Sequence, residues 1–110
     1  MPAHTMPVDQ YTDALGANGL VLDVREPDEV AEGTIPGALH IPLGELQERV
    51  GELDPGVPVA VLCRSGGRSA MAAEFLDASG FGQVTNLAGG ILAYSGTLGA
   101  PASPSGEGDG

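Results

Sequence analysis

Short apolar runs alternate with amphipathic segments along most of this chain, and Gly or Pro residues separate them. The run 20–24 is continuous except for Asp23, which is typical of a strand buried on both faces. The run 57–63 is the clearest strand, and 38–43 and 83–89 have similar character. Strands that alternate with helices of this length favour a parallel sheet flanked by helices on both faces, so we predict an α/β fold.

Helices are predicted in the segments that separate or flank these runs. The pattern of apolar residues and of Gly and Pro breaks places them at residues 8–19, 26–33, 44–50, 69–79 and 89–96. Pro27 stands near the start of the second helix, where a missing N–H is harmless. The fourth helix ends at Gly80, and we expect its apolar stripe to consist of Met71, Ala72, Phe75 and Leu76.

The 110 residues are enough for one domain, which we expect to span residues 1–98. Residues 99–110 consist almost entirely of Gly, Pro, Ser, Ala and acidic residues, which predicts a disordered tail. The formal net charge is −11, and all four basic residues are arginines. Such a surface repels phosphate backbones and anionic lipids, so we expect neither nucleic acid nor a membrane as a partner.

The chain has features of a protein from a reducing compartment. Residues 1–10 have neither the positive charge nor the apolar run of a signal peptide. A single cysteine cannot form an internal disulfide or a thiolate zinc cluster. His4 and His40 are too scattered for metal-ligand spacing, and we expect His40 to be packed or half-exposed at a strand. The sequence therefore predicts a cytoplasmic protein without a metal.

The single cysteine lies in the stretch VLCRSGGRSA, at the end of the strongest predicted strand. In parallel α/β sheets, ligands bind beyond the carboxyl ends of strands, where loops lead into helices. Gly66 and Gly67 permit positive φ angles that turn backbone N–H groups inward. These N–H groups, a helix N-terminus near Ser69 and nearby arginine side chains all favour a thiolate. We therefore expect Cys63 to be reactive rather than an inert buried cysteine.

The spacing from Cys63 to Arg68 is C-x4-R. This loop is too tight for a tetrahedral phosphate, since phosphatase-type loops have one residue more between the same two positions. A single extra sulfur on Cys63 fits better, and the loop N–H groups would give its negative charge strong hydrogen bonds.

Four segments together resemble single-domain rhodaneses, a sulfurtransferase family with this α/β fold. They stand in the family's order and spacing, and the resemblance covers about residues 8–98. The segments are CRSGGRS at 63–69, LDVREPDE at 22–29, GTIPGALHIPL at 33–43 and NLAGGILAY at 86–94.

The resemblance implies that Cys63 is the nucleophile and carries a persulfide. It also implies a sulfur-binding loop composed of Arg64, Ser65, Gly66, Gly67, Arg68 and Ser69, in which Ser69 also caps the helix. Asp23 and Arg25 match the family's DVR element, where we expect structural ion pairs, including one between Arg25 and Glu32. Thr34 and Tyr94 stand where the family often has His and Trp, so the substrate entrance is less well defined than the nucleophile.

These inferences predict a sulfurtransferase without a metal or organic cofactor. Cys63 would take sulfur from a small anionic donor such as thiosulfate, and an external thiol, a protein or cyanide would accept it. Two alternatives stay open: a cysteine phosphatase or arsenate reductase, and a rhodanese-like binding or sensing module without turnover. A serine hydrolase is excluded because SGGRS lacks the G-x-S-x-G elbow.

Overall fold

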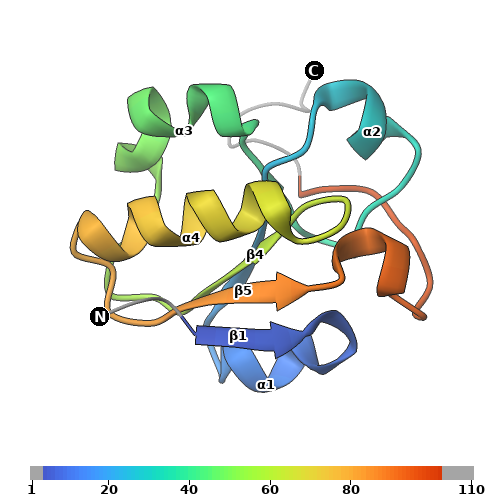
Figure 1. Cartoon of the computed structure of the whole chain (residues 1–110), viewed down its shortest axis with the longest axis horizontal. Helices are drawn as coiled ribbons and strands as arrows, with labels where there is room; N and C mark the ends of the chain where they lie inside the picture. Colours follow the sequence, from blue (N-terminus) through green and yellow to red (C-terminus); the bar gives the residue numbers. More distant parts are fainter. Residues whose placement is uncertain (1–3, 103–110) are drawn as a thin grey trace.

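The computed structural model describes residues 4–102, in which five strands form one parallel sheet. The strand order is β1-β5-β4-β2-β3, and every neighbouring pair is parallel. The predicted α/β fold with a parallel sheet is confirmed (Figure 1). The strands are β1 (His4–Pro7), β2 (Leu20–Asp23), β3 (Leu39–His40), β4 (Val59–Leu62) and β5 (Val84–Ala88).

Helices cover both faces of the sheet. On one face lie α3 (Leu43–Arg49) and α4 (Gly67–Ala78), and on the other lies α1 (Tyr11–Leu15) (Figure 1). A further helix, α2 (Pro27–Ala31), follows β2, and Pro27 is its first residue, as predicted. Three short 3-10 turns complete the described chain: η1 (Val8–Gln10), η2 (Val50–Glu52) and η3 (Gly90–Ala93).

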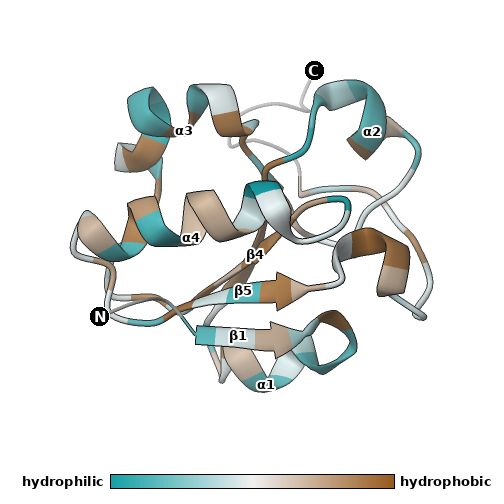
Figure 2. Ribbon diagram, viewed as in Figure 1, coloured by the Kyte–Doolittle hydropathy of each residue, from teal (hydrophilic) through white to brown (hydrophobic). Residues whose placement is uncertain are grey.

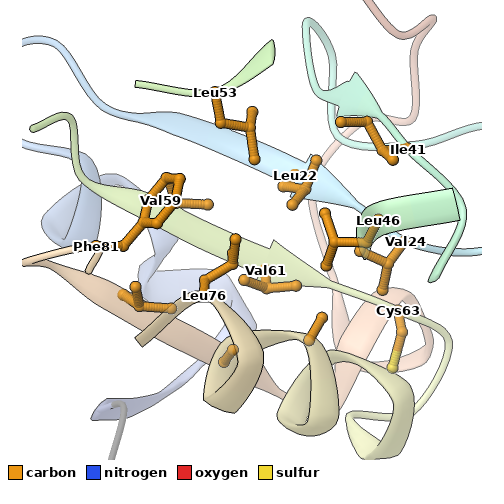
Figure 3. Packing of buried hydrophobic residues seen from close by; sticks show 13 residues of the cluster. Leu22, Val24, Ile41, Leu46, Leu53, Val59, Val61, Cys63, Leu76 and Phe81 are labelled. Atoms are coloured by element: carbon orange, nitrogen blue, oxygen red, sulfur yellow. The ribbon is translucent and has the colours of Figure 1, made fainter. Parts of the chain in front are cut away.

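Alternation along the strands divides the apolar side chains into two cores. In Figure 2 the central strand β4 is brown and apolar, whereas the edge strand β1 begins teal and white. On the α3–α4 face, Val59 and Val61 pack with Leu76 and Phe81, and Cys63 lies at the end of this cluster (Figure 3). On the α1 face, the buried residues are Val8, Val21, Ile35, Ala38, Ala60, Leu62 and Leu87.

The first strand and two of the helices differ from the sequence prediction. β1 was not predicted, because His4–Pro7 is a mostly exposed segment that pairs only with β5 at the sheet edge. The helix predicted at 8–19 is a 3-10 turn followed by a five-residue α-helix that ends before Gly16, whose φ is +59°. The helix predicted at 89–96 is the four-residue turn η3.

The long helix α4 begins two residues earlier than predicted. Gly66 is its N-cap, and its first residue is Gly67. Ala72 and Leu76 of the predicted stripe are buried, but Met71 is 63% exposed, because it points away from the sheet. Among residues 4–102, no helix combines the length and apolarity that a membrane crossing requires.

The predicted tail begins at Gly99, whereas the structure shows the chain hydrogen-bonded to the domain as far as Ala102. Thr34 and Gly99 form an antiparallel bridge with N–O distances of 3.0 and 2.8 Å. The N–H of Ala102 donates to the carbonyl of Ala38 at 2.8 Å. Backbone pairing fixes this segment, and composition does not reveal such pairing. The rest of the predicted tail, 103–110, lies outside the described residues.

Candidate active site

Cys63 immediately follows β4, a central strand of the sheet. Its side chain continues the row of Val59 and Val61 and therefore points toward α4 (Figure 3). Cys63 is only 1% exposed, whereas the next two residues, Arg64 and Ser65, are exposed. The sulfur atom of Cys63 thus lies just beneath the turn that connects the strand to the helix. We call residues 63–69 the Cys63 loop.

Backbone N–H groups of the Cys63 loop surround the sulfur. The N–H of Gly66 donates to Sγ at 3.0 Å, and those of Ser65 and Ser69 also stabilise its negative charge. Gly66 adopts a φ of +111°, which glycine tolerates far better than other residues do. Gly67 has no positive φ, so only the first of the two glycines makes the predicted turn.

The surroundings of Cys63 act on its pKa in opposite directions. Burial raises the pKa of the thiol. Hydrogen bonds from the Ser69 side chain and from the loop N–H groups lower the pKa, and together they outweigh the effect of burial. The net result is a pKa below the usual value for cysteine. This direction agrees with the prediction that Cys63 is an activated thiol.

The two loop arginines occupy different environments. Arg68 forms a two-point ion pair with Glu29, with N–O distances of 2.8 and 2.9 Å. This pairing lowers the pKa of Glu29 to about 2 and raises that of Arg68. Arg64 is exposed and forms no ion pair within the described part of the chain. The sequence predicted that both arginines act on an anion at Cys63, but Glu29 largely neutralises Arg68.

Ser69 and Asn86 form a hydrogen-bonded group next to the sulfur. The thiol of Cys63 donates to Ser69 Oγ at 3.3 Å, and Ser69 Oγ donates to Asn86 Oδ1 at 2.5 Å. Ser69 is the third residue of α4 and not its cap, which corrects the predicted role. Asn86 was not predicted as a site residue. Its position follows from strand register, because Asn86 pairs with Val61 of β4, two residues before Cys63.

The turn η3 is hydrogen-bonded to the backbone of the Cys63 loop. The N–H groups of Ile91 and Leu92 donate to the carbonyls of Cys63 and Arg64 at 2.9 and 3.1 Å. Gly90 lies so close that an added Cβ would be 2.4 Å from the Arg64 carbonyl oxygen. The segment 89–92 therefore fixes the backbone of the loop.

The family of the chain follows from comparison with known proteins. A family model described as "Rhodanese-like domain" matches residues 7–97. The chain belongs to this rhodanese-like family. It is similar to a protein named "Sulfurtransferase" from Allochromatium vinosum, with 42% identity over 76 residues that cover 69% of this chain and 71% of the relative. It is also similar to "Thiosulfate sulfurtransferase GlpE" from Ectopseudomonas mendocina, with 33% identity over 90 residues that cover 81% and 83%.

A solved structure supports the same assignment. The rhodanese-like domain protein of Staphylococcus aureus has a TM-score of 0.77 and 28% identity, over 91% of this chain and 98% of that one. The resemblance inferred from the four sequence segments is confirmed.

The DVR element of this rhodanese-like domain forms a buried polar cluster. Arg25 donates to Asp23 from Nε and from Nη2, the latter at 2.8 Å, and Thr34 Oγ1 donates to Asp23 at 2.7 Å. The expected ion pair is therefore present, but the predicted partner of Arg25, Glu32, was wrong. His40 is half-buried at the end of β3, as predicted, with Nε2 2.7 Å from the Arg25 carbonyl oxygen.

Thr34 and Tyr94, where this chain departs from the family pattern, both have structural contacts. Thr34 is fully buried against Asp23. Tyr94 packs edge-on against Tyr11 with ring centroids 6.3 Å apart, and its hydroxyl donates to the Thr97 carbonyl at 3.0 Å. Neither side chain has a hydrogen bond to Cys63 or to the other residues of its loop.

Proposed function

We propose that this protein is a sulfurtransferase in which Cys63 carries the transferred sulfur as a persulfide. The observation that carries the proposal is the convergence of the Ser65, Gly66 and Ser69 N–H groups on Sγ. Such donors stabilise a thiolate and, after sulfur transfer, the negative charge of a persulfide. The sulfurtransferase names of two similar proteins support the same chemistry.

In the first step, the Cys63 thiolate attacks the outer sulfur of a donor such as thiosulfate. A bond forms between Sγ and that sulfur, while the sulfur–sulfur bond of thiosulfate breaks and sulfite leaves with the bonding electron pair. The product is an anionic persulfide on Cys63. The depressed pKa of the thiol supplies the attacking anion without a separate base.

In the second step, an external nucleophile removes the outer sulfur. A thiolate or cyanide attacks that atom, the bond to Sγ breaks, and Cys63 returns as a thiolate. The chain has one cysteine, so a second thiol of the same chain cannot serve as the acceptor. The acceptor is therefore a small thiol or a partner protein.

Arg64 is the cation available to an anionic donor. It is exposed next to Cys63, whereas Arg68 is paired with Glu29. On a chain with a formal charge of −11, an unpaired arginine at the loop provides local attraction for thiosulfate. Because Cys63 is only 1% exposed, the donor has to approach Sγ past the exposed residues Arg64 and Ser65.

Mass spectrometry of the intact protein tests the proposal. After incubation with thiosulfate and removal of the excess, we expect the protein to gain the mass of one sulfur atom and to lose it on addition of cyanide. Cys63→Ser should gain nothing, and the exposed neighbour substitution Ser65→Ala provides a matched control that still loads sulfur. An unmodified wild-type protein, or equal sulfur transfer by Cys63→Ser, would overturn the proposal.

The same preparation separates the two alternatives. Hydrolysis of p-nitrophenyl phosphate that depends on Cys63 would indicate a cysteine phosphatase. Loading that occurs once, with no discharge to any thiol, would indicate a persulfide sensor. A comparison of kcat/KM for thiosulfate, glutathione persulfide and mercaptopyruvate then identifies the donor class. A cytoplasmic location stays a prediction from the sequence.

A further inference from the structure

Asn86 lies at the centre of the polar contacts behind the Cys63 sulfur. It is half-buried on β5, and its side chain shares the α4 face of the sheet with Cys63. Its Nδ2 donates to the Gly66 carbonyl at 3.4 Å, and its Oδ1 accepts from Ser69 Oγ. Asn86 thus contacts both the residue whose N–H binds the sulfur and the residue whose hydroxyl binds it.

The Gly66 carbonyl determines which way the Asn86 amide faces. A carbonyl oxygen only accepts hydrogen bonds, so the amide nitrogen of Asn86 must face it. The amide oxygen therefore faces Ser69, and this oxygen also only accepts. The hydroxyl proton of Ser69 therefore has Asn86 Oδ1, at 2.5 Å, as its nearer acceptor and the Gly66 carbonyl, at 3.1 Å, as its second one.

Ser69 has a single hydroxyl proton, and this limits what it can offer the sulfur. While Cys63 is a thiol, its S–H donates to Ser69 Oγ, and the Ser69 proton stays with Asn86 or with the Gly66 carbonyl, 3.1 Å away. Once the sulfur is an anion, it has no proton to donate and itself requires a donor. The Ser69 hydroxyl can then donate to the sulfur only by leaving these two acceptors, of which Asn86 is the nearer.

We propose that Asn86 is a positioning residue for sulfur transfer, which holds the Ser69 hydroxyl proton away from Cys63 in the thiol form and releases it when the sulfur becomes an anion. This role rests on the proposed function, because it controls the charge state of the proposed sulfur carrier. Asn86 competes with the sulfur for one proton. Its removal should therefore make the thiolate easier to form.

Charged groups around Cys63 stay unchanged when Asn86 is replaced. On the loop and on α4 these are Arg64 and Arg68, and the charge of Cys63 acts on Arg68. Glu29 of α2 is held in the ion pair with Arg68. Asp23 and Arg25, at the end of the neighbouring strand β2, are paired with each other. A change of the Cys63 titration in an Asn86 variant can therefore be attributed to the lost hydrogen bonds with Ser69 and Gly66 and not to an altered ion pair.

The pH dependence of Cys63 alkylation by iodoacetamide is the primary test. Asn86→Leu keeps the branched shape of the side chain but removes both hydrogen bonds, and Asn86→Ala removes them with less bulk. We expect both variants to lower the titration midpoint of Cys63 by about half a pH unit to one unit, the equivalent of one neutral hydrogen bond. An unchanged or raised midpoint in folded variants would overturn the proposal.

A double-mutant cycle shows whether Asn86 acts through Ser69. Ser69→Ala alone should raise the midpoint, because the thiolate loses a donor. In that background, Asn86→Leu should shift the midpoint by less than about a quarter of its effect in the parent protein. Equal shifts in both backgrounds would contradict the assigned role and point to a direct effect of Asn86 on the sulfur.

A measurement on the unsubstituted protein covers the case in which the variants do not fold. The side-chain amide resonances of Asn86 should titrate with the midpoint of Cys63, since the Ser69 proton leaves Asn86 as the thiolate forms. Resonances that stay constant through that midpoint would overturn the proposal. Neither alkylation nor these resonances depend on sulfur transfer, so failure to load thiosulfate sulfur would reject the proposed function separately.

Discussion

The Arg68 guanidinium and the Glu29 carboxylate meet in a two-point ion pair across 39 positions of sequence. Arg68 lies in the first turn of α4, two residues after Gly66, whose N–H binds the sulfur. Glu29 lies in α2, and the same carboxylate accepts the backbone N–H of Glu26 at 3.0 Å. The pair therefore joins the short helix α2 to the N-terminal end of the helix that carries the Cys63 loop.

Replacement of Glu29 by Gln should destabilise the protein by about 1 kcal/mol at neutral pH, the upper part of the range for partly exposed ion pairs. The folded-state pKa of Glu29, about 2, lies below its unfolded value of about 4.3. The ion pair therefore makes its full contribution to the free energy of unfolding at pH values above the unfolded pKa. It should disappear as the pH falls from about 5 to about 2. Urea unfolding of both proteins across this range provides the measurement.

The matched control for this prediction is Glu45→Gln in the ion pair with Arg49. This pair is more exposed, with 35% and 52% of the side-chain surfaces accessible, and its removal should cost less than about 0.5 kcal/mol. A stability difference for Glu29→Gln that persists undiminished near pH 2 would contradict the assignment.

Gly90→Ala should disrupt the Cys63 loop. An added Cβ would lie 2.4 Å from the Arg64 carbonyl oxygen, and the φ of Gly90 is +61°. Steric overlap and backbone strain together should cost about 2–4 kcal/mol and reduce sulfur loading. Gly67→Ala is the control, because Gly67 is helical, has no positive φ and has open space around it. Thermal unfolding with intact-mass loading distinguishes them, and equal behaviour of the two variants would refute the prediction.

Arg64→Ala should raise the KM for thiosulfate by about 3- to 10-fold with a smaller change in kcat, because it removes a charge-assisted contact to the donor anion. The increase should shrink at high ionic strength, which screens an exposed charge. Arg49→Ala removes one charge of the same sign at a surface ion pair and should leave KM almost unchanged. If Arg49→Ala raised KM equally, the increase would come from the change in net charge and not from a contact between Arg64 and the donor.

Asp23→Asn should destabilise the domain by about 3–5 kcal/mol, because it leaves the buried Arg25 guanidinium without a counter-charge. Thr34→Val removes only one hydrogen bond to Asp23 and should cost about 1–2 kcal/mol. Denaturant unfolding gives both values. Adding Arg25→Gln to Asp23→Asn should restore part of the lost stability, because it removes the unpaired charge. If the double variant were no more stable than Asp23→Asn, an unpaired charge would not be the cause of the destabilisation.

The local features of this chain could be predicted from its sequence. The apolar run 57–63 and the glycine-bounded helix after it place Cys63 at a strand-to-helix turn, and the structure has β4 and α4 there. Local spacing is sufficient because strand and helix periodicity are properties of neighbouring residues. The edge strand β1 was missed because its four residues show no apolar alternation and each of them pairs with a residue of β5 that lies 81 positions later in the chain.

The side-chain partners in the site could not be predicted in the same way. Asn86 begins the segment NLAGGILAY, but its place beside Cys63 depends on the pairing of β4 with β5. Arg68 stood next to the glycines and was expected to serve the anion, yet its partner Glu29 comes from a distant helix. Such contacts depend on tertiary packing, which residue spacing along one segment does not specify.

In the Cys63 loop, backbone N–H groups and backbone carbonyls face different neighbours. Their N–H groups face the sulfur, while the carbonyls of Cys63 and Arg64 face the N–H groups of Ile91 and Leu92. Apart from the Ser69 hydroxyl, the groups that stabilise the anion thus belong to the main chain, and side-chain replacement at exposed positions such as Ser65 leaves them in place. Substitutions at the exposed loop positions can therefore change the surface that a donor or acceptor meets without removing the N–H groups that face Sγ.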